Sequence, residues 1–290
     1  ACLVGSEMCI RDRYRSIRRL ADLGRQFAKG RFQEELFSLF QRLLLNEDGP
    51  YYEMLKQLVS SVDTDSLKTL GINIGYNSWT CGASRLRQIT AEKDYPHWLA
   101  EISLSPESSA SQLKEQLSAA LKNGTYAFRL HMPAQSITTD TRQLGLIREF
   151  PDCSFFLDFM DTDCTYSDDL LELTCSCDNL AFLVPFGSLQ SRQLVDLLNA
   201  RQRIYGVCRT YDNTNAAERI SDSQISEMLS WGSPLLFFLA AADTTQDNRL
   251  LVDNAILDAR LHQTYPALLI HLDADVARIQ QLLLSSRKNL

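Results

Sequence analysis

Seven short apolar runs, spaced at nearly regular intervals, constrain the fold more than any other feature of this sequence. They begin at residues 99, 126, 153, 180, 203, 234 and 267, so successive starts are 27, 27, 27, 23, 31 and 33 residues apart. Each interval accommodates one strand, one crossover helix and two loops, which is the repeating unit of a parallel βα array. Between the runs, Leu113, Leu117 and Leu121 recur at helical spacing. The sequence therefore predicts an α/β protein with a partial (βα) TIM-like barrel of about 6–7 parallel strands.

An open doubly wound sheet is the other architecture that suits a parallel sheet of this size. The near-regular repeats, and the absence of a GxGxxG motif after the first run, favour the barrel. Both architectures bind ligands at the carboxyl ends of their strands, so the residues that end the apolar runs are candidates for a site. These residues are Ser103, Ser105, His131, Asp158, Asp161, Asp163, Arg209, Tyr211, Asp243, His271, Asp273 and Asp275. The candidate ligand-binding residues at the barrel mouth are His131, Asp158, Asp161, Asp243, His271 and Asp273, and no residue is assigned a catalytic role.

The chain divides into a helical region and the βα array. From residue 14 to about residue 89 apolar side chains recur every three or four positions, so residues 14–95 are predicted to be helical and residues 96–290 to form the barrel. The first of these helices is locally basic, which we interpret as a solvated face. Residues 1–13 resemble a translated sequencing adapter, which implies that the natural N-terminus is missing, and they are left out of the fold reasoning.

Charge and cysteine usage exclude several classes of protein. Lys and Arg total 29 and Asp and Glu total 36, so the net charge is −7, which argues against nucleic acid as a partner. No run of about 18 apolar residues is present, so no membrane span is expected. Apart from Cys175 and Cys177 the cysteines are scattered, which predicts reduced thiols and a cytoplasmic protein.

Residues 71–89, GINIGYNSWTCGASRLRQI, carry a specific resemblance. They are similar to the stretch GINxGYNSWTYGA that precedes the catalytic barrel in a group of radical S-adenosylmethionine (radical SAM) proteins. The apolar runs that follow, from DYPHWLAEISL to WGSPLLFFLAAAD, resemble the strands of that family in order. The resemblance extends over roughly residues 14–275 and implies a radical SAM-like barrel.

The family's cofactor residues are missing from this sequence. Radical SAM enzymes hold a [4Fe-4S] cluster on a CxxxCxxC loop after the first strand, and three thiolates are needed there. No cysteine lies between Cys81 and Cys153, and the family's GGEP and TNG motifs are replaced by HMPA at 131–134 and MDT at 160–162. The resemblance therefore implies a degenerate member that has lost both the cluster and S-adenosylmethionine, and no cofactor is expected.

Two functions remain open from the sequence. The first is a catalytically silent pseudoenzyme that binds a partner protein, such as an active radical SAM relative, or a peptide or small ligand. The alternative is a repurposed barrel enzyme with metal-assisted hydrolytic chemistry, because carboxylates and imidazoles end several strands. In that alternative His271, Asp273 and Asp275 alternate along one face of the seventh strand; otherwise HLDAD is the polar face of an edge strand.

Overall fold

The structure is a computed structural model that describes residues 34, 38, 41–42, 46, 48–89, 96–104, 109–132, 145–159, 172 and 176–285. The predicted basic helix and the candidate residue Asp161 lie outside these ranges.

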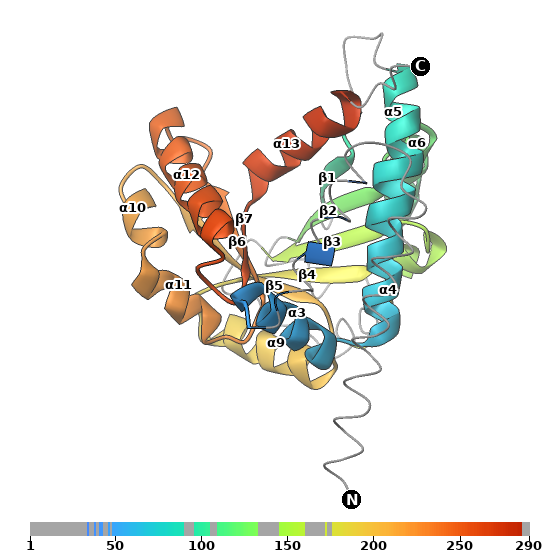
Figure 1. Cartoon of the computed structure of the whole chain (residues 1–290). Helices are drawn as coiled ribbons and strands as arrows, with labels where there is room; N and C mark the ends of the chain where they lie inside the picture. Colours follow the sequence, from blue (N-terminus) through green and yellow to red (C-terminus); the bar gives the residue numbers. More distant parts are fainter. Residues whose placement is uncertain are drawn as a thin grey trace, which may run out of the picture.

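Seven parallel strands form one sheet whose spatial order follows the sequence, from β1 to β7. The sheet curls into a half-barrel (Figure 1). The strands are β1 (Leu99–Ser103), β2 (Ala127–Met132), β3 (Ser154–Phe159), β4 (Leu180–Pro185), β5 (Tyr205–Tyr211), β6 (Leu235–Ala240) and β7 (Leu268–His271). Each strand lies within one of the seven apolar runs, so the predicted partial barrel of parallel strands is confirmed.

Helices on the convex side of the sheet enclose the main core. They are α6 (Ala110–Lys122), η3 (Leu146–Glu149), α9 (Leu189–Ala200), α10 (Ala216–Arg219), α11 (Asp222–Leu229) and α12 (Gln246–His262). Alternate strand residues face these helices, and Phe128, Phe182 and Phe238 among them are at most 1% exposed. Serine N-caps fix helix starts just after the strands, as where Ser109 and Gln112 form a capping box on α6.

A second set of helices covers the beginnings of the strands and part of the concave side. These helices are α3 (Pro50–Ser61), α4 (Thr64–Ile72), η1 (Asn73–Gly82), α5 (Ala83–Ile89) and α13 (Leu272–Ser285). Leu70 of α4 packs against Ala181 and Ile204, and Leu283 of α13 packs against Leu99. Helix α13 extends from the end of β7 back toward α5 (Figure 1). Within the described ranges, no helix has both the length and the apolar character needed to cross a membrane.

Helices α4, η1 and α5 together contain the stretch that resembles the radical SAM signature. Asn73 donates hydrogen bonds from Nδ2 to the carbonyls of Pro151 and Cys153, just before β3. The Ser78 hydroxyl donates to the carbonyl of Trp98, just before β1. Because these contacts all lie where strands begin, the signature stretch packs at the amino-terminal ends of the strands. Ligands bind at the opposite, carboxyl ends in such sheets.

The end of the seventh run differs from the prediction. Strand β7 ends at His271 and α13 begins at Leu272, so Asp273 and Asp275 lie in the first helical turn. Both interpretations of HLDAD as a continuous strand are therefore wrong. The apolar residues Leu272, Val276, Ile279 and Leu283 recur at helical spacing, and carboxylates near a helix N-terminus are favoured by the helix dipole.

Candidate functional site

Four charged side chains meet on the concave side of β1, β2 and β3, near the carboxyl ends of the strands. Strand pairing sets Glu101 opposite Arg129, and His131 opposite Asp158. Side chains on alternate residues share a face, so these four point to one side of the sheet. We call Glu101, Arg129, His131 and Asp158 the charged quartet.

Arg129 is the centre of the charged quartet. Its Nε and Nη2 atoms both donate to Asp158 Oδ2, at 2.8 Å and 2.5 Å, and its Nη1 donates to Glu101 Oε1 at 3.0 Å. Arg129 is 5% exposed and Asp158 is 3% exposed. A buried charge is tolerated only when it is paired and hydrogen-bonded, and each of these two residues supplies that partner to the other.

His131 shares both carboxylates with Arg129. Its Nε2 lies 3.1 Å from Glu101 Oε2, and its Nδ1 lies 3.4 Å from Asp158 Oδ2. The second contact lacks hydrogen-bond geometry, so it is an ionic attraction. The carboxylates of Asp158 and then Glu101 raise the pKa of His131 from 6.5 to about 9, although burial opposes this. His131 is therefore an imidazolium at neutral pH, and the charged quartet carries two positive and two negative charges.

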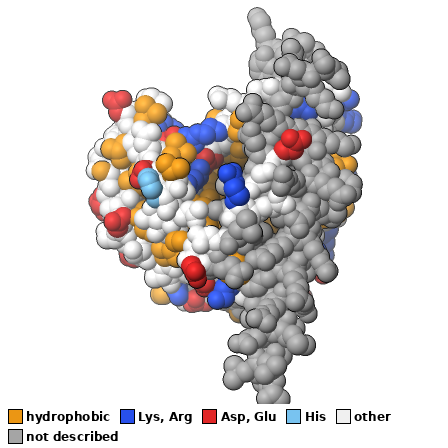
Figure 2. All heavy atoms as spheres, in the orientation of Figure 1, with side chains coloured by type: hydrophobic (Ala, Val, Ile, Leu, Met, Phe, Trp, Pro, Cys, Tyr) orange, Lys and Arg blue, Asp and Glu red, His pale blue; other side chains and the backbone are white. Residues whose placement is uncertain are grey.

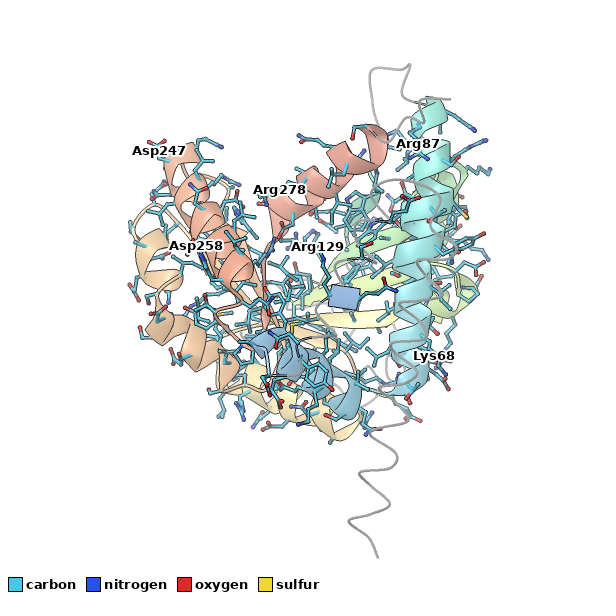
Figure 3. All side chains as sticks on the ribbon, viewed as in Figure 1. Lys68, Arg87, Arg129, Asp247, Asp258 and Arg278 are labelled. Atoms are coloured by element: carbon cyan, nitrogen blue, oxygen red, sulfur yellow. The ribbon has the colours of Figure 1, made fainter. Side chains whose placement is uncertain are left out.

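Glu101 is the member of the charged quartet that faces solvent, with 52% of its side chain exposed. The hydrogen bond from His131, followed by the charge of Arg129, lowers the pKa of Glu101 from 4.5 to about 2. Arg129 points into the concave side of the sheet in Figure 3, and Figure 2 shows a hollow on the same face with basic and apolar side chains around it. Glu101 and His131 are thus the members that a ligand would meet first.

A second hollow lies nearby at the same edge of the sheet. A cavity of about 360 Å³ opens between the end of β1 and α6. It is lined by Ile102, Ser103, Leu104, Gln112, Leu113, Glu115 and Gln116. Ile102 and Leu113 belong to the convex-side core, so this cavity lies on the α6 side of β1, whereas the charged quartet faces the concave side.

The geometry of the charged quartet does not suit a divalent cation. Metal sites bring three or more carboxylate, imidazole or thiolate ligands around one point, and the described part of the chain contains no such group. The two carboxylates of the quartet face the guanidinium of Arg129, which lies between them where a cation would have to sit.

The described cysteines do not fit an iron–sulfur cluster. The connection from β1 to α6, residues 104–109, contains none. Cys81 lies exposed on η1, whereas Cys153, Cys177 and Cys208 are buried. Burial raises the pKa of Cys153 to about 12 and raises that of Cys208 as well, so both are uncharged thiols in this structure.

The other predicted site residues lie apart from the charged quartet. His271 is buried on the convex side, where its Nε2 lies 2.7 Å from the Tyr211 hydroxyl and its Nδ1 lies 3.2 Å from Asp253 Oδ1. Asp273 forms an ion pair with Arg249 at 3.3 Å, and Asp243 is exposed in the turn after β6. Of the five candidates within the described ranges, the structure brings together only His131 and Asp158.

Glu101 and Arg129 were missed by sequence reasoning because they lie inside strands rather than at strand ends. Their signal is nevertheless present in the sequence. A charged residue inside an otherwise apolar run, with an opposite charge at the matching position of the next run, predicts a cross-strand ion pair. The runs LAEIS and AFRLHM have this pattern.

Comparisons with known proteins leave the family of this chain open: no family model matches it, and no curated protein sequence matches it.

Proposed function

We propose that this protein is a degenerate radical SAM-like half-barrel that performs no radical chemistry and binds a ligand at the charged quartet. The ligand carries both a carboxylate and an ammonium group, as a free amino acid or the end of a peptide does. The observation that supports this most directly is the self-neutralised arrangement of Glu101, Arg129, His131 and Asp158 at the carboxyl ends of β1–β3.

The chemistry follows from the charges. With His131 protonated, the charged quartet offers donors on Arg129 and His131 and an acceptor on Glu101. A zwitterionic ligand can replace the exposed Glu101–His131 contact by placing its carboxylate on His131 and its ammonium on Glu101. This exchange leaves no buried charge unpaired. A ligand with a single charge would pair with either His131 or Glu101 and leave the other unpaired.

The same arrangement supports binding over hydrolysis. Metal-assisted hydrolysis needs convergent ligands with an open position for water. The carboxylates of the charged quartet are already paired with Arg129, and Asp243, His271 and Asp273 lie elsewhere in the fold. The proposal therefore assigns the quartet to recognition.

Titration with amino acids tests the proposal. The probes are the twenty standard amino acids, followed by N-acetyl amino-acid amides, which lack both charges. Saturation-transfer NMR and calorimetry are expected to show saturable binding of at least one free amino acid and of no blocked one. Glu101→Gln is expected to weaken that binding about tenfold, the effect of losing one charge-assisted hydrogen bond.

Glu149→Gln is the matched control, because it also neutralises a half-exposed carboxylate that pairs with one cation, Lys114. It is expected to leave the affinity unchanged. Absence of saturable binding, or equal affinity in wild type and Glu101→Gln, would contradict the proposal.

A further inference from the structure

A second group of cations lies at the carboxyl end of β5, on the convex side of the sheet and away from the charged quartet. Arg209 lies between Val207 and Tyr211 on the face that packs against the helices. Its guanidinium carbon lies 4.7 Å from the centre of the Phe186 ring, just beyond β4. Stacking on the ring fixes the orientation of the guanidinium plane. The N–H groups point outward within that plane, where they can donate to an acceptor beside the ring.

Arg209 has a donor nitrogen for which the described residues provide no acceptor. Its Nη1 atom is buried and has no hydrogen-bond partner. Buried donors in folded proteins are almost always paired, so an unpaired guanidinium nitrogen calls for an external acceptor.

Arg219 has the same deficiency. It ends the short helix α10 that follows β5, and its Nε atom is also buried without a hydrogen-bond partner. Burial lowers the pKa of Arg209, and the nearby charge of Arg219 lowers it further. The carboxylates whose charges oppose this belong to Glu227 and Glu218, which are exposed on α11 and α10. Asp212, at the end of β5, also lies within the field of Arg219, whose charge is one of the causes that lower its pKa. Arg209 and Arg219 therefore lie in one neighbourhood at the end of β5, and each keeps one buried nitrogen without an acceptor among the described residues.

We propose that Arg209 and Arg219 form an anion site that binds a phosphate group, either as free phosphate or as a phosphate monoester. Guanidinium groups match phosphate oxygens in geometry and remain charged at every physiological pH. A phosphate group carries acceptor oxygens in three directions, so that one group can accept from the unpaired nitrogens of both arginines. The site lies at the carboxyl edge of the parallel sheet, the edge at which (βα) barrels place their ligand sites.

The site is independent of the ligand proposed for the charged quartet. Helices α10 and α11 lie at the outer rim of the half-barrel in Figure 1, whereas the quartet faces the concave side between β1 and β3. Failure of either proposal leaves the other intact.

Calorimetric titration with inorganic phosphate, and separately with phenyl phosphate, tests the site at constant ionic strength set with sodium chloride. Saturable binding is expected for the full chain. Arg209→Gln and Arg219→Gln are each expected to weaken it by about tenfold or more, because each removes one charge-assisted hydrogen bond. Tighter binding of phenyl phosphate than of inorganic phosphate would identify an ester as the ligand, and the reverse order would identify free phosphate.

Arg192→Gln is the matched control. Arg192 also stacks on a ring, that of Trp231 at 5.8 Å, but its Nη1 donates to the carbonyl of Ser230 and its Nε lies 3.4 Å from Asp196 Oδ1. Its substitution is expected to leave phosphate binding unchanged. The proposal is overturned if wild type shows no saturable binding of either probe, or if Arg209→Gln and Arg219→Gln bind as wild type does while their circular dichroism spectra are native.

Discussion

At the scale of single residues, the charged quartet makes the stability of the protein depend on pH. The pKa of His131 is raised from 6.5 to about 9 in the folded state, so its stabilising contribution is complete below pH 6.5 and is lost as the pH rises through 9. A shift of this size corresponds to at most ~3 kcal/mol. The pKa of Glu101 is lowered, so its contribution is lost in the opposite direction, as the pH falls from 4.5 toward 2.

Urea denaturation of wild type and His131→Gln across this range measures the effect. The difference in unfolding free energy between the two proteins is expected to be constant from about pH 5 to 6.5 and to shrink between pH 6.5 and 9. A difference that stays the same up to pH 10 would show that the neighbouring carboxylates do not raise the pKa of His131.

Arg129 is expected to be the most sensitive position of the charged quartet. Arg129→Met leaves the buried Asp158 carboxylate without its hydrogen-bonded cation and with only the longer ionic contact to His131; breaking a buried pair typically costs about 3–5 kcal/mol. The double variant Arg129→Met/Asp158→Leu removes the unpaired charge as well, so it is expected to recover much of that loss in urea denaturation. If the double variant is as unstable as the single variant, the cost lies in packing rather than in the unpaired charge.

At the scale of elements, the stretch that resembles a family signature, residues 71–89, contributes packing between η1 and the turn before β2. A Cβ atom added at Gly82 would lie 2.3 Å from the carbonyl oxygen of Gly124, whereas one added at Gly75 would meet nothing within 4 Å. Gly82→Ala is therefore expected to destabilise the protein by about 1–3 kcal/mol, because the helix must move away from the turn before β2.

Gly75→Ala is the control for that substitution. It lies in the same element, and replacing a helical glycine by alanine in open space is expected to be neutral or to stabilise by up to ~1 kcal/mol. Thermal unfolding of the two variants distinguishes close packing from helix propensity. Equal effects of the two substitutions would contradict the close approach of η1 to Gly124.

The free edge of β7 is protected by side chains. The Leu268 amide donates to the carbonyl of Pro234, the residue before β6. Backbone groups alternate in direction along a strand, so those of Leu269 and His271 face away from β6. Arg260 Nε donates to the Leu269 carbonyl at 2.7 Å, and Asp275 accepts from the His271 amide at 3.0 Å. The guanidinium of Arg260 also pairs with Asp275. Unpaired strand edges promote association between molecules. Arg260 and Asp275 provide hydrogen-bond partners for the backbone groups of β7 from within the chain.

Asp275→Ala is accordingly expected to increase self-association. Light scattering coupled to size-exclusion chromatography over a range of concentrations would show species larger than those of wild type. Asp258→Ala removes a carboxylate from the exposed face of α12 and is expected to behave as wild type. A variant at position 275 with an unchanged mass distribution would show that the β7 edge does not need this cover.

At the scale of the whole molecule, the strands of the sheet could be predicted from the sequence, whereas the packing of helices on its concave side could not. The spacing of the apolar runs predicts seven parallel strands because each strand and its crossover helix have characteristic lengths. The packing of α3, α4 and α13 against the concave side depends on contacts between distant segments, such as Trp98 with Gln280 and Val276, which leave no periodic signal. His271 and Asp158 both follow apolar runs, yet they face opposite sides of the sheet, because strand residues alternate and the run alone does not fix the register.

We propose that this half-barrel carries no iron–sulfur cluster, although residues 71–89 resemble the signature of a family that does. The most direct measurement is iron and sulfide analysis with an absorption spectrum, after anaerobic reconstitution of the purified chain. We expect a folded, colourless protein without stoichiometric iron or sulfide. Stoichiometric iron and sulfide with a thiolate-to-iron band at about 400 nm would contradict the proposal and restore radical chemistry as the function.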